Sequence, residues 1–316
     1  MRKGIVIKST GSWLVVRGGD NRNIRCRIKG NFRIKGIRST NPVTVGDHVE
    51  YIITNSDAAA KGQETGMITA IDDRKNYIVR RSQNLSKQSH VIAANIDQVF
   101  LLITQSHPVT TTTFIDRFLA SAEAYRIPAI LVFNKADLLD DNQLKQSGVL
   151  VKLYETIGYK CLITSAVTGE GLTELKQAME GKISLFGGHS GVGKTTLINL
   201  IQPGLKLKTR EISELHKTGK HTTSFTEMYE LNFGGYVIDT PGIKAFGMLD
   251  MQSWEISHYF PEIFRLSADC QYNNCTHTHE PGCAVKTAVE KGAIAQSRFI
   301  SYLGLLEADE KYRPAY

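Results

Sequence analysis

The segment ISLFGGHSGVGKTTLINLI constrains the fold more than any other part of the chain. It reads as an apolar strand, a glycine-rich G-x-x-x-x-G-K-T loop from Gly188 to Thr195, and an amphipathic helix. A strand that feeds a helix through such a loop is typical of parallel α/β domains, in which the helix N-terminus faces a phosphate group. We therefore expect a phosphate-binding loop at the edge of an α/β sheet.

The residue types in this loop suit a nucleoside triphosphate. Its glycines allow backbone N–H groups to curve around phosphate oxygens, and Lys194 is expected to neutralise the β- and γ-phosphates. The Thr195 hydroxyl is the expected magnesium ligand. The residues expected to contact the phosphates are Gly188, His189, Ser190, Gly191, Val192, Gly193, Lys194, Thr195 and Thr196.

A second motif, NKAD, follows an apolar strand and indicates which base is bound. The Asp137 carboxylate matches the N1–H and N2–H₂ edge of guanine, while Asn134 fits the opposite edge and the Lys135 stem covers the ring. After the next strand comes TSAVTGEGL, where Ser165 and Ala166 are expected to support the base from the other side. Guanine is the expected base, and a phosphate-loop ATPase or kinase is the alternative.

The remaining nucleotide motif, DTPG, ends a further apolar strand. Asp239 is expected to hold magnesium through water, and the Gly242 N–H to meet the γ-phosphate. Small GTPases ordinarily begin with the phosphate loop, whereas here NKAD and TSA precede it. A parallel sheet tolerates such a rotation when the original termini lie close together. The sequence therefore predicts a circularly permuted GTPase domain.

Apolar strands and helical patterns alternate through this central region, which is the signature of an α/β fold. Strands are predicted at 96–104, 129–133, 160–164, 182–187, 225–231 and 235–239. Helices are predicted at 112–126, 141–157, 171–180 and 194–201.

The first 72 residues show about five short alternating segments and no helical pattern. An N-terminal OB-fold β-barrel is the leading prediction, because this five-stranded fold commonly binds oligonucleotides, and an SH3-like barrel is the alternative. The polar, basic stretch from Asp72 to Gln88 reads as a linker.

Basic residues are concentrated at the N-terminal end. Residues 1–40 carry eleven Lys and Arg against Asp20 alone, a net charge of +10 in a chain whose total is +7. Such a concentration favours binding to a polyanion such as RNA. A solvated basic face is the alternative.

Helical stretches at the C-terminal end flank a cluster of possible metal ligands. Cys270, Cys275, His277 and Cys283 form the pattern C-x-x-x-x-C-x-H-x-x-x-x-x-C. Three thiolates and an imidazole suit a closed tetrahedral zinc site of structural type. His279 is an alternative ligand to His277, and reduced thiols without metal are the alternative to the site.

These features together closely resemble the ribosome small subunit-dependent GTPase A family, over nearly the whole chain. The resemblance rests on the permuted motif order, on GKHTTS from Gly219 to Ser224 as the switch segment, and on the cysteine pattern. It implies a factor that binds the small ribosomal subunit and its rRNA late in maturation. Such a factor hydrolyses GTP when the subunit stimulates it and then leaves.

The residue after DTPG is Ile243, where many GTPases carry a glutamine that orients the attacking water. An aliphatic side chain cannot orient water, so intrinsic hydrolysis is expected to be slow. The family resemblance points to His221 as a catalytic candidate, with Thr222 or Thr223 binding magnesium. A structural role for His221 and an RNA-binding module with negligible turnover are the alternatives.

Three domains are expected: an OB-fold barrel at 1–72, a permuted GTPase domain at 73–245 and a mainly helical zinc-binding domain at 246–316. No apolar run approaches the roughly 18 residues of a membrane span, and the start MRKGIVIKST lacks the features of a signal peptide. We expect a cytoplasmic monomer with no membrane partner.

Overall fold

The computed structural model describes residues 1–10, 13–28, 42–54, 64–81, 89–205, 226–239 and 252–312. Packing divides the chain into two compact units. The first comprises Met1–Gln98, Lys176–Phe186 and Thr195–Ile243, and the second comprises Val99–Leu175, Gly187–Lys194 and Lys244–Tyr316.

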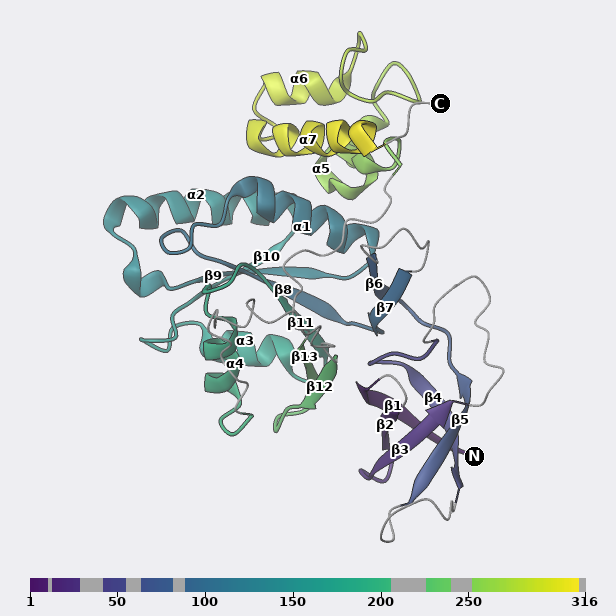
Figure 1. The fold of residues 1–316 in the computed structure, drawn as a ribbon. Coiled ribbons are helices and arrows are strands. Elements are labelled where there is room, and N and C mark those ends of the chain that lie inside the picture. The colour runs from purple at the N-terminus through teal and green to yellow at the C-terminus, as the bar shows by residue number, and fades with distance from the viewer. Residues whose placement is uncertain are drawn as a thin grey trace, which may run out of the picture. The chain divides into compact units, whose positions relative to one another are not determined.

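The first unit begins with a five-stranded barrel (Figure 1). Its strands follow the order β1-β2-β3-β5-β4, and β4 closes the barrel by pairing with β1. β3 and β5 run parallel, and the other pairs are antiparallel. This arrangement confirms the predicted OB fold. The strands are β1 (Arg2–Ser9), β2 (Leu14–Gly18), β3 (Asn23–Ile28), β4 (His48–Thr54) and β5 (Thr65–Ile71).

Alternation along each strand fills the barrel with apolar side chains. In β3, Ile24 and Cys26 are buried whereas Arg25 and Arg27 are exposed on the opposite face. The interior is completed by apolar residues from the other strands and from one loop. These are Val6, Leu14, Val16, Val43, Val49, Tyr51 and Ile68.

The prediction of a linker from Asp72 to Gln88 is wrong in part. β6 (Tyr77–Arg81) pairs antiparallel with β7 (Ser89–Ala94) to form a two-stranded sheet. Only Ile78 and Val79 are aliphatic in YIVRR, so the flanking charges hid a short strand. Arg74, which also falls in this stretch, is buried in an ion pair whose Nε lies 2.6 Å from Asp47 Oδ1.

Three strands of the nucleotide-binding region also lie in the first unit. β11 (Ile183–Gly187) is parallel to β13 (Tyr236–Asp239), and β12 (Glu227–Glu230) is antiparallel to β13. β12 pairs on its other side with barrel strand β1, where Lys8 lies opposite Glu227. The Lys8 ammonium forms an ion pair of 2.9 Å with the Glu227 carboxylate.

The second unit contains a parallel sheet in the order β10-β9-β8. Its strands are β8 (Gln98–Ile103), β9 (Ala129–Asn134) and β10 (Lys160–Thr164). β8 is buried along its whole length. Its helices include α1 (Thr112–Ala124) and α2 (Asp141–Ile157), with the 3₁₀ turn η1 at Ala136–Leu138. The helix α3 (Leu172–Met179) begins in this unit, and α4 (Lys194–Ile201) belongs to the first unit from Thr195 onward. These bounds lie close to the predicted ones.

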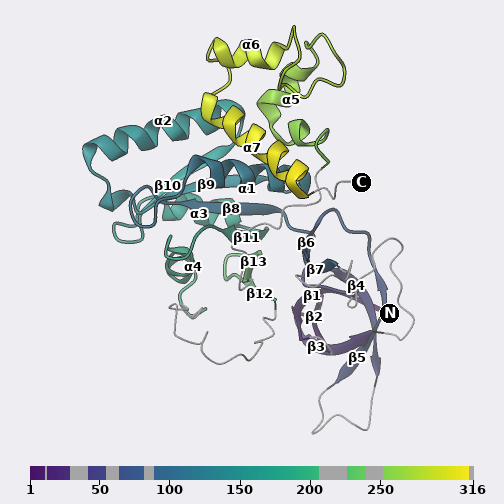
Figure 2. The same ribbon diagram turned by 45° about the horizontal axis from the view of Figure 1, so that its top comes forward.

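The C-terminal helices also belong to the second unit. They are η3 (Ile256–Tyr259), α5 (Pro261–Ser267), α6 (Ala284–Glu290) and α7 (Gln296–Tyr312). The helical stretches predicted on the two sides of the Cys/His cluster are each interrupted. The one before the cluster is broken just ahead of Pro261, and the one after it is broken at Gly292, which adopts a φ of 73°. Figure 2 shows α7 lying along α1, and Ala120 of α1 joins the core of these helices. Among the described residues, no helix is both long and apolar enough to span a bilayer.

A buried ion network joins α7 to α1 and α5. Arg298 is fully buried, and its guanidinium donates to Glu262 Oε1 at 2.6 Å and to Asp116 Oδ1 at 2.9 Å. Burial opposes the charge on Arg298, but hydrogen bonds to Glu262 and the charge of Asp116 raise its pKa. The Tyr154 hydroxyl of α2 also donates to Asp116 Oδ1, at 2.9 Å. The C-terminal helices are therefore anchored on α1 by buried charges.

Candidate nucleotide-binding site and metal centre

The phosphate loop connects β11 to α4 and depends on its glycines. Gly188, Gly191 and Gly193 have φ angles of 130°, 82° and 97°, which L side chains rarely adopt. A Cβ atom at Gly188 would lie 2.7 Å from the Leu102 carbonyl oxygen, and one at Gly193 would lie 2.5 Å from Asn134 Nδ2. These two glycines are therefore required both by backbone conformation and by close neighbours.

The Lys194 ammonium lies inside the loop. Its Nζ donates to the carbonyl oxygens of Gly188 at 2.7 Å and His189 at 2.6 Å. Burial lowers the pKa of Lys194 to about 8. The lysine is thus held by two weak acceptors at the place where phosphate oxygens are expected, and a phosphate would offset the cost of burying its charge.

Asn134 connects the base-reading motif to the phosphate loop. It ends β9, is buried, and donates from Nδ2 to the Val192 carbonyl at 2.7 Å. Its Oδ1 accepts a hydrogen bond of 2.9 Å from the Thr164 hydroxyl at the end of β10. NKAD, TSA and the phosphate loop therefore meet at one point, although Asn134 and Val192 are 58 positions apart.

The other members of NKAD are held by the loops that surround them. Lys135 adopts a left-handed φ of 63°, and its Nζ donates to the His107 carbonyl at 2.6 Å. The Ser165 hydroxyl donates to Asp137 Oδ1 at 2.5 Å and accepts from the Val167 N–H at 3.1 Å. Asp137 is exposed and so has carboxylate lone pairs available for a ligand.

Two contacts of this site had no signal in the sequence. The Phe114 ring, near the start of α1, lies 3.9 Å from the His189 ring between centroids. The periodicity of α1 predicts Phe114 as a packing residue but not its partner in the phosphate loop. The carbonyl of His107 is likewise a backbone group, and no side-chain pattern reveals its hydrogen bond to Lys135.

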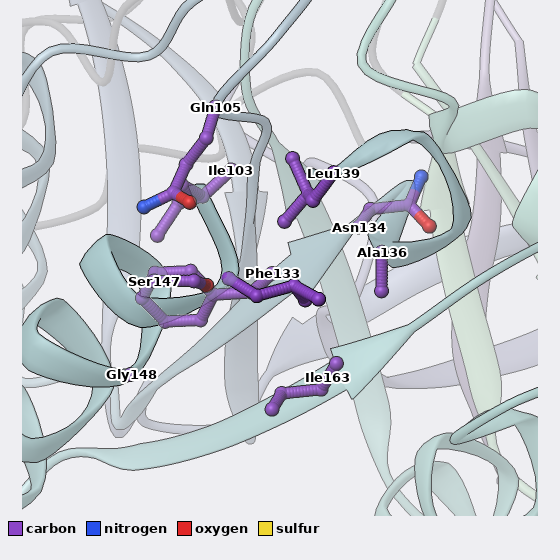
Figure 3. Close-up of a pocket in the computed structure, with 10 residues that line it drawn as sticks. Ile103, Gln105, Phe133, Asn134, Ala136, Leu139, Ser147, Gly148 and Ile163 are labelled. Atoms are coloured by element: carbon purple, nitrogen blue, oxygen red, sulfur yellow. The ribbon is translucent and has the colours of Figure 1, made fainter. Parts of the chain in front are cut away.

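A small cavity of about 80 Å³ lies beside Asn134 (Figure 3). Its walls are mainly apolar and include Ile103, Phe133, Leu139 and Ile163. Such a lining does not suit phosphates, so we assign the charged part of a nucleotide to the loop and not to this cavity.

Several predicted residues cannot be placed. His221, Thr222, Thr223, Gly242 and Ile243 lie outside the described residues. Asp239 ends β13, but its side chain also lies outside the described part. In the phosphate loop, Ser190 and Thr196 are exposed and Thr195 is half-buried at the start of α4. Ala166 is half-buried after Ser165.

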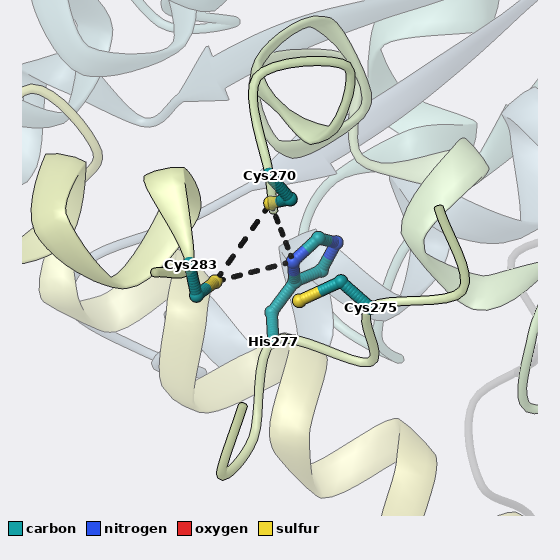
Figure 4. A group of neighbouring side chains, drawn as sticks. All are labelled: Cys270, Cys275, His277 and Cys283. Atoms are coloured by element: carbon teal, nitrogen blue, oxygen red, sulfur yellow. Dashed lines mark hydrogen bonds between the residues drawn. The ribbon is translucent and has the colours of Figure 1, made fainter. Parts of the chain in front are cut away.

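The predicted metal ligands converge in the segment between α5 and α6 (Figure 4). His277 Nδ1 lies 3.6 Å from Cys270 Sγ and 3.4 Å from Cys283 Sγ, and the two sulfur atoms are 3.9 Å apart. With Cys275, all four ligand atoms lie within 4.8 Å of one another. Tetrahedral zinc with bonds of ~2.3 Å to sulfur and ~2.0 Å to nitrogen requires separations of this size. The donor set and its spacing therefore fit zinc.

The loop around these ligands is braced independently of any metal. The Glu280 carboxylate accepts hydrogen bonds from the backbone N–H groups of Thr276 at 2.7 Å and Thr278 at 3.0 Å. Burial opposes its charge, but a hydrogen bond from the Thr276 hydroxyl at 2.6 Å, together with these backbone hydrogen bonds, lowers the pKa of Glu280 to about 2. His277 adopts a left-handed φ of 60° that turns its ring into the cluster, whereas His279 is exposed and contacts Thr278. The geometry therefore favours His277 as the ligand.

Comparison with known proteins gives matches along the whole chain. The profile of the RsgA GTPase family matches residues 71–249, and that of the RsgA N-terminal domain matches residues 3–60. The small ribosomal subunit biogenesis GTPase RsgA 2 of Bacteroides thetaiotaomicron is 58% identical to this chain, in an alignment that covers 99% of this chain and 100% of the relative. RsgA of Flavobacterium johnsoniae is 56% identical over 98% of this chain and 94% of its own.

Two solved structures share the fold. YjeQ from Thermotoga maritima is 35% identical, with a TM-score of 0.79 and coverage of 99% of both chains. YloQ, described as a circularly permuted GTPase, is 29% identical, with a TM-score of 0.76 over 99% of this chain and 96% of its own.

Proposed function

Because this chain belongs to the RsgA GTPase family, we propose that it hydrolyses GTP when stimulated by the small ribosomal subunit and acts late in the assembly of that subunit. In this proposal the protein binds rRNA of the maturing subunit, and GTP hydrolysis triggers its release. It acts as a monomer in the cytoplasm.

One observation carries the GTP part of the proposal, namely the hydrogen bond from Asn134 Nδ2 to the Val192 carbonyl. It holds the base-reading motif against the phosphate loop, so a single guanine nucleotide can contact both. Asp137 supplies acceptors for the N1–H and N2–H₂ edge of guanine, and Ser165 orients that carboxylate. Adenine would leave these buried or oriented polar groups without partners, which costs binding free energy.

The phosphate end of the site follows from the loop. We assign the backbone N–H groups of residues 188–196 and the Lys194 ammonium to the phosphate oxygens, with Asp239 and Gly242 at the γ-phosphate. Thr195 with Thr222 or Thr223 would hold magnesium, which supplies positive charge that stabilises the departing phosphate. Lys194 withdraws from two carbonyl oxygens to take up that role.

The residue at position 243 explains why a partner is needed. An isoleucine offers no hydrogen bond to a water molecule, so the isolated protein is expected to turn GTP over slowly. We assign the positioning of water to His221, with the subunit fixing the segment that carries it.

The domains proposed for this function are the barrel at 1–72, the permuted GTPase domain at 73–245 and the C-terminal domain at 246–316. Zinc bound by Cys270, Cys275, His277 and Cys283 would have no free coordination position, so its role is structural.

The decisive experiment measures GTP turnover with and without purified small subunits. Strong stimulation by small subunits and none by large subunits is expected. His221→Ala is expected to reduce the stimulated rate while leaving GTP affinity nearly unchanged. Undetectable turnover even with small subunits would instead favour a nucleotide-gated RNA-binding module, the alternative that Ile243 supports.

A further inference from the structure

The barrel carries two arginines that differ from its other described basic residues. Five of the seven described Lys and Arg residues in the barrel lie within 4 Å of a carboxylate, and these are Arg2, Lys3, Lys8, Arg17 and Arg22. Arg25 and Arg27 have no carboxylate at that distance in the described part of the chain. Both guanidinium groups instead lie over the Trp13 ring, at 4.9 Å and 4.2 Å from its centroid.

This difference localises the positive charge of the barrel. A carboxylate at ion-pair distance largely cancels the field of its partner, whereas a neutral indole ring leaves the full charge of each guanidinium in place. Among the described basic residues of the barrel, five of seven are balanced by a carboxylate within the molecule. The uncompensated charge among the described barrel residues therefore concentrates beside one aromatic side chain.

The strand register fixes the geometry of this group. Leu14 pairs with Cys26 and Val15 with Arg25, so Trp13, which precedes β2, lies next to Arg27. Arg25 and Arg27 project from the same exposed face of β3. The Thr10 N–H and hydroxyl both donate to the Trp13 carbonyl at 2.9 Å. Trp13 is thus held by its backbone and remains half-buried.

We propose that Trp13, Arg25 and Arg27 form a binding site for an unpaired RNA segment, with a base stacked on the indole and the guanidinium groups on adjacent phosphates. Aromatic rings and arginines are the groups that recognise unstacked bases and their backbone. In OB folds, oligonucleotides bind on the face of the second and third strands and at the loop between the first two. The inference rests on the proposed function, because it assigns part of the rRNA contact to these three residues.

The first test uses the fluorescence of Trp13 itself. The chain contains two tryptophans, and Trp254 is 64% exposed, so Trp254→Phe leaves Trp13 as the single reporter in an otherwise intact protein. Titration with a single-stranded oligouridine is expected to quench its emission as the RNA binds. Heparin, an anion without bases, is expected to quench it much less. Binding of labelled RNA with no change in Trp13 emission, or equal quenching by heparin, would overturn the proposal.

The second test compares substitutions that change the net charge equally. Arg25→Gln and Arg27→Gln are each expected to weaken RNA binding several-fold and to reduce the slope of log affinity against log salt by ~0.7 for each phosphate that is no longer neutralised. Lys3→Gln removes the same charge, but Lys3 is paired with Glu50, so a much smaller change is expected. Equal effects of all three would mean that the barrel acts as a diffuse basic surface, and the proposed site would be wrong.

Two substitutions of Trp13 test whether its ring stacks on a base. Trp13→Leu is expected to weaken binding roughly tenfold, and Trp13→Phe, which retains a ring for stacking, to recover part of that loss. Thermal unfolding of both variants separates loss of binding from loss of fold. If small subunits stimulate GTP turnover of the unmodified protein but Trp13→Leu binds RNA normally, the proposed RNA site is wrong and the proposed function stands. If small subunits do not stimulate GTP turnover of the unmodified protein, the proposed function is wrong.

Discussion

Gly193 in the phosphate loop and Asn134 in NKAD are in such close contact that a single methyl group would separate them. An added Cβ at Gly193 would lie 2.5 Å from Asn134 Nδ2, which is the atom that bonds to Val192. The base-reading and phosphate-binding loops are therefore held together as one site, although the order of these motifs in the sequence is permuted.

Gly193→Ala is expected to weaken GTP binding by tenfold or more. The substitution strains a residue with a φ of 97° and displaces Asn134, and such strain costs about 1–3 kcal/mol. Fluorescent-nucleotide titration measures the loss. Gly148→Ala in α2 is the control, because an added Cβ there meets nothing within 4 Å and should stabilise the helix by about 0.5–1 kcal/mol without affecting GTP. Unchanged GTP affinity in Gly193→Ala would contradict the role of this contact.

The affinity for GTP is expected to fall at alkaline pH. Burial lowers the pKa of Lys194 to about 8 in the free protein, and a bound phosphate must raise it because it favours the ammonium form. The favourable charge is therefore fully present below pH ~8 and is lost as the pH rises through that value, by at most about tenfold per pH unit. Equilibrium titrations between about pH 7 and 9.5 measure the effect. Lys194→Arg provides the comparison, since a guanidinium stays charged and should abolish the alkaline decline.

Arg298→Met is expected to destabilise the protein by about 3–5 kcal/mol, because it leaves the buried carboxylates of Asp116 and Glu262 without their partner. Urea unfolding followed by circular dichroism measures this loss. The triple variant that adds Asp116→Asn and Glu262→Gln removes the unpaired charges and should recover part of the stability. If the single and triple variants were equally unstable, lost packing rather than unpaired charge would be the cause.

Metal analysis is expected to find one zinc per chain, bound by four ligands that include His277. His277→Ala should lower the zinc content and His279→Ala should not, because only the His277 ring nitrogen lies among the cysteine sulfurs. Acidification should release the metal, since zinc competes with protons for thiolate and imidazole. Retention of zinc by His277→Ala together with its loss from His279→Ala would reverse the assignment.

Local patterns in the sequence were sufficient to predict most of the fold. The alternation in β3 and the strand–loop–helix around Gly188 are properties of short segments, so a five-stranded barrel and a phosphate loop could both be predicted from the sequence. β6 was missed because Arg80 and Arg81 follow only two aliphatic residues.

The features that could not be predicted from the sequence depend on contacts between segments that are far apart in the chain. Arg298 has partners 36 and 182 positions away, and a single arginine in a helix gives no sign that it will be buried. The contact between the Phe114 and His189 rings also joins segments that are distant in the sequence. In contrast, the cluster of Cys270, Cys275, His277 and Cys283 was predictable because these four residues lie within one short segment, so their spacing already indicates their convergence.

The anchoring of α7 on α1 has a consequence for how the protein unfolds. Because Asp116 and Ala120 of α1 complete the interior of the C-terminal helices, those helices and the sheet that carries NKAD are expected to melt in one cooperative transition. A fragment that ends near residue 245 would lack these helices, which would expose Ala120 of α1 to water and leave the Asp116 carboxylate without Arg298. Loss of the Cys270, Cys275, His277 and Cys283 cluster is therefore expected to lower the melting temperature of the sheet that carries NKAD as well as that of the C-terminal helices.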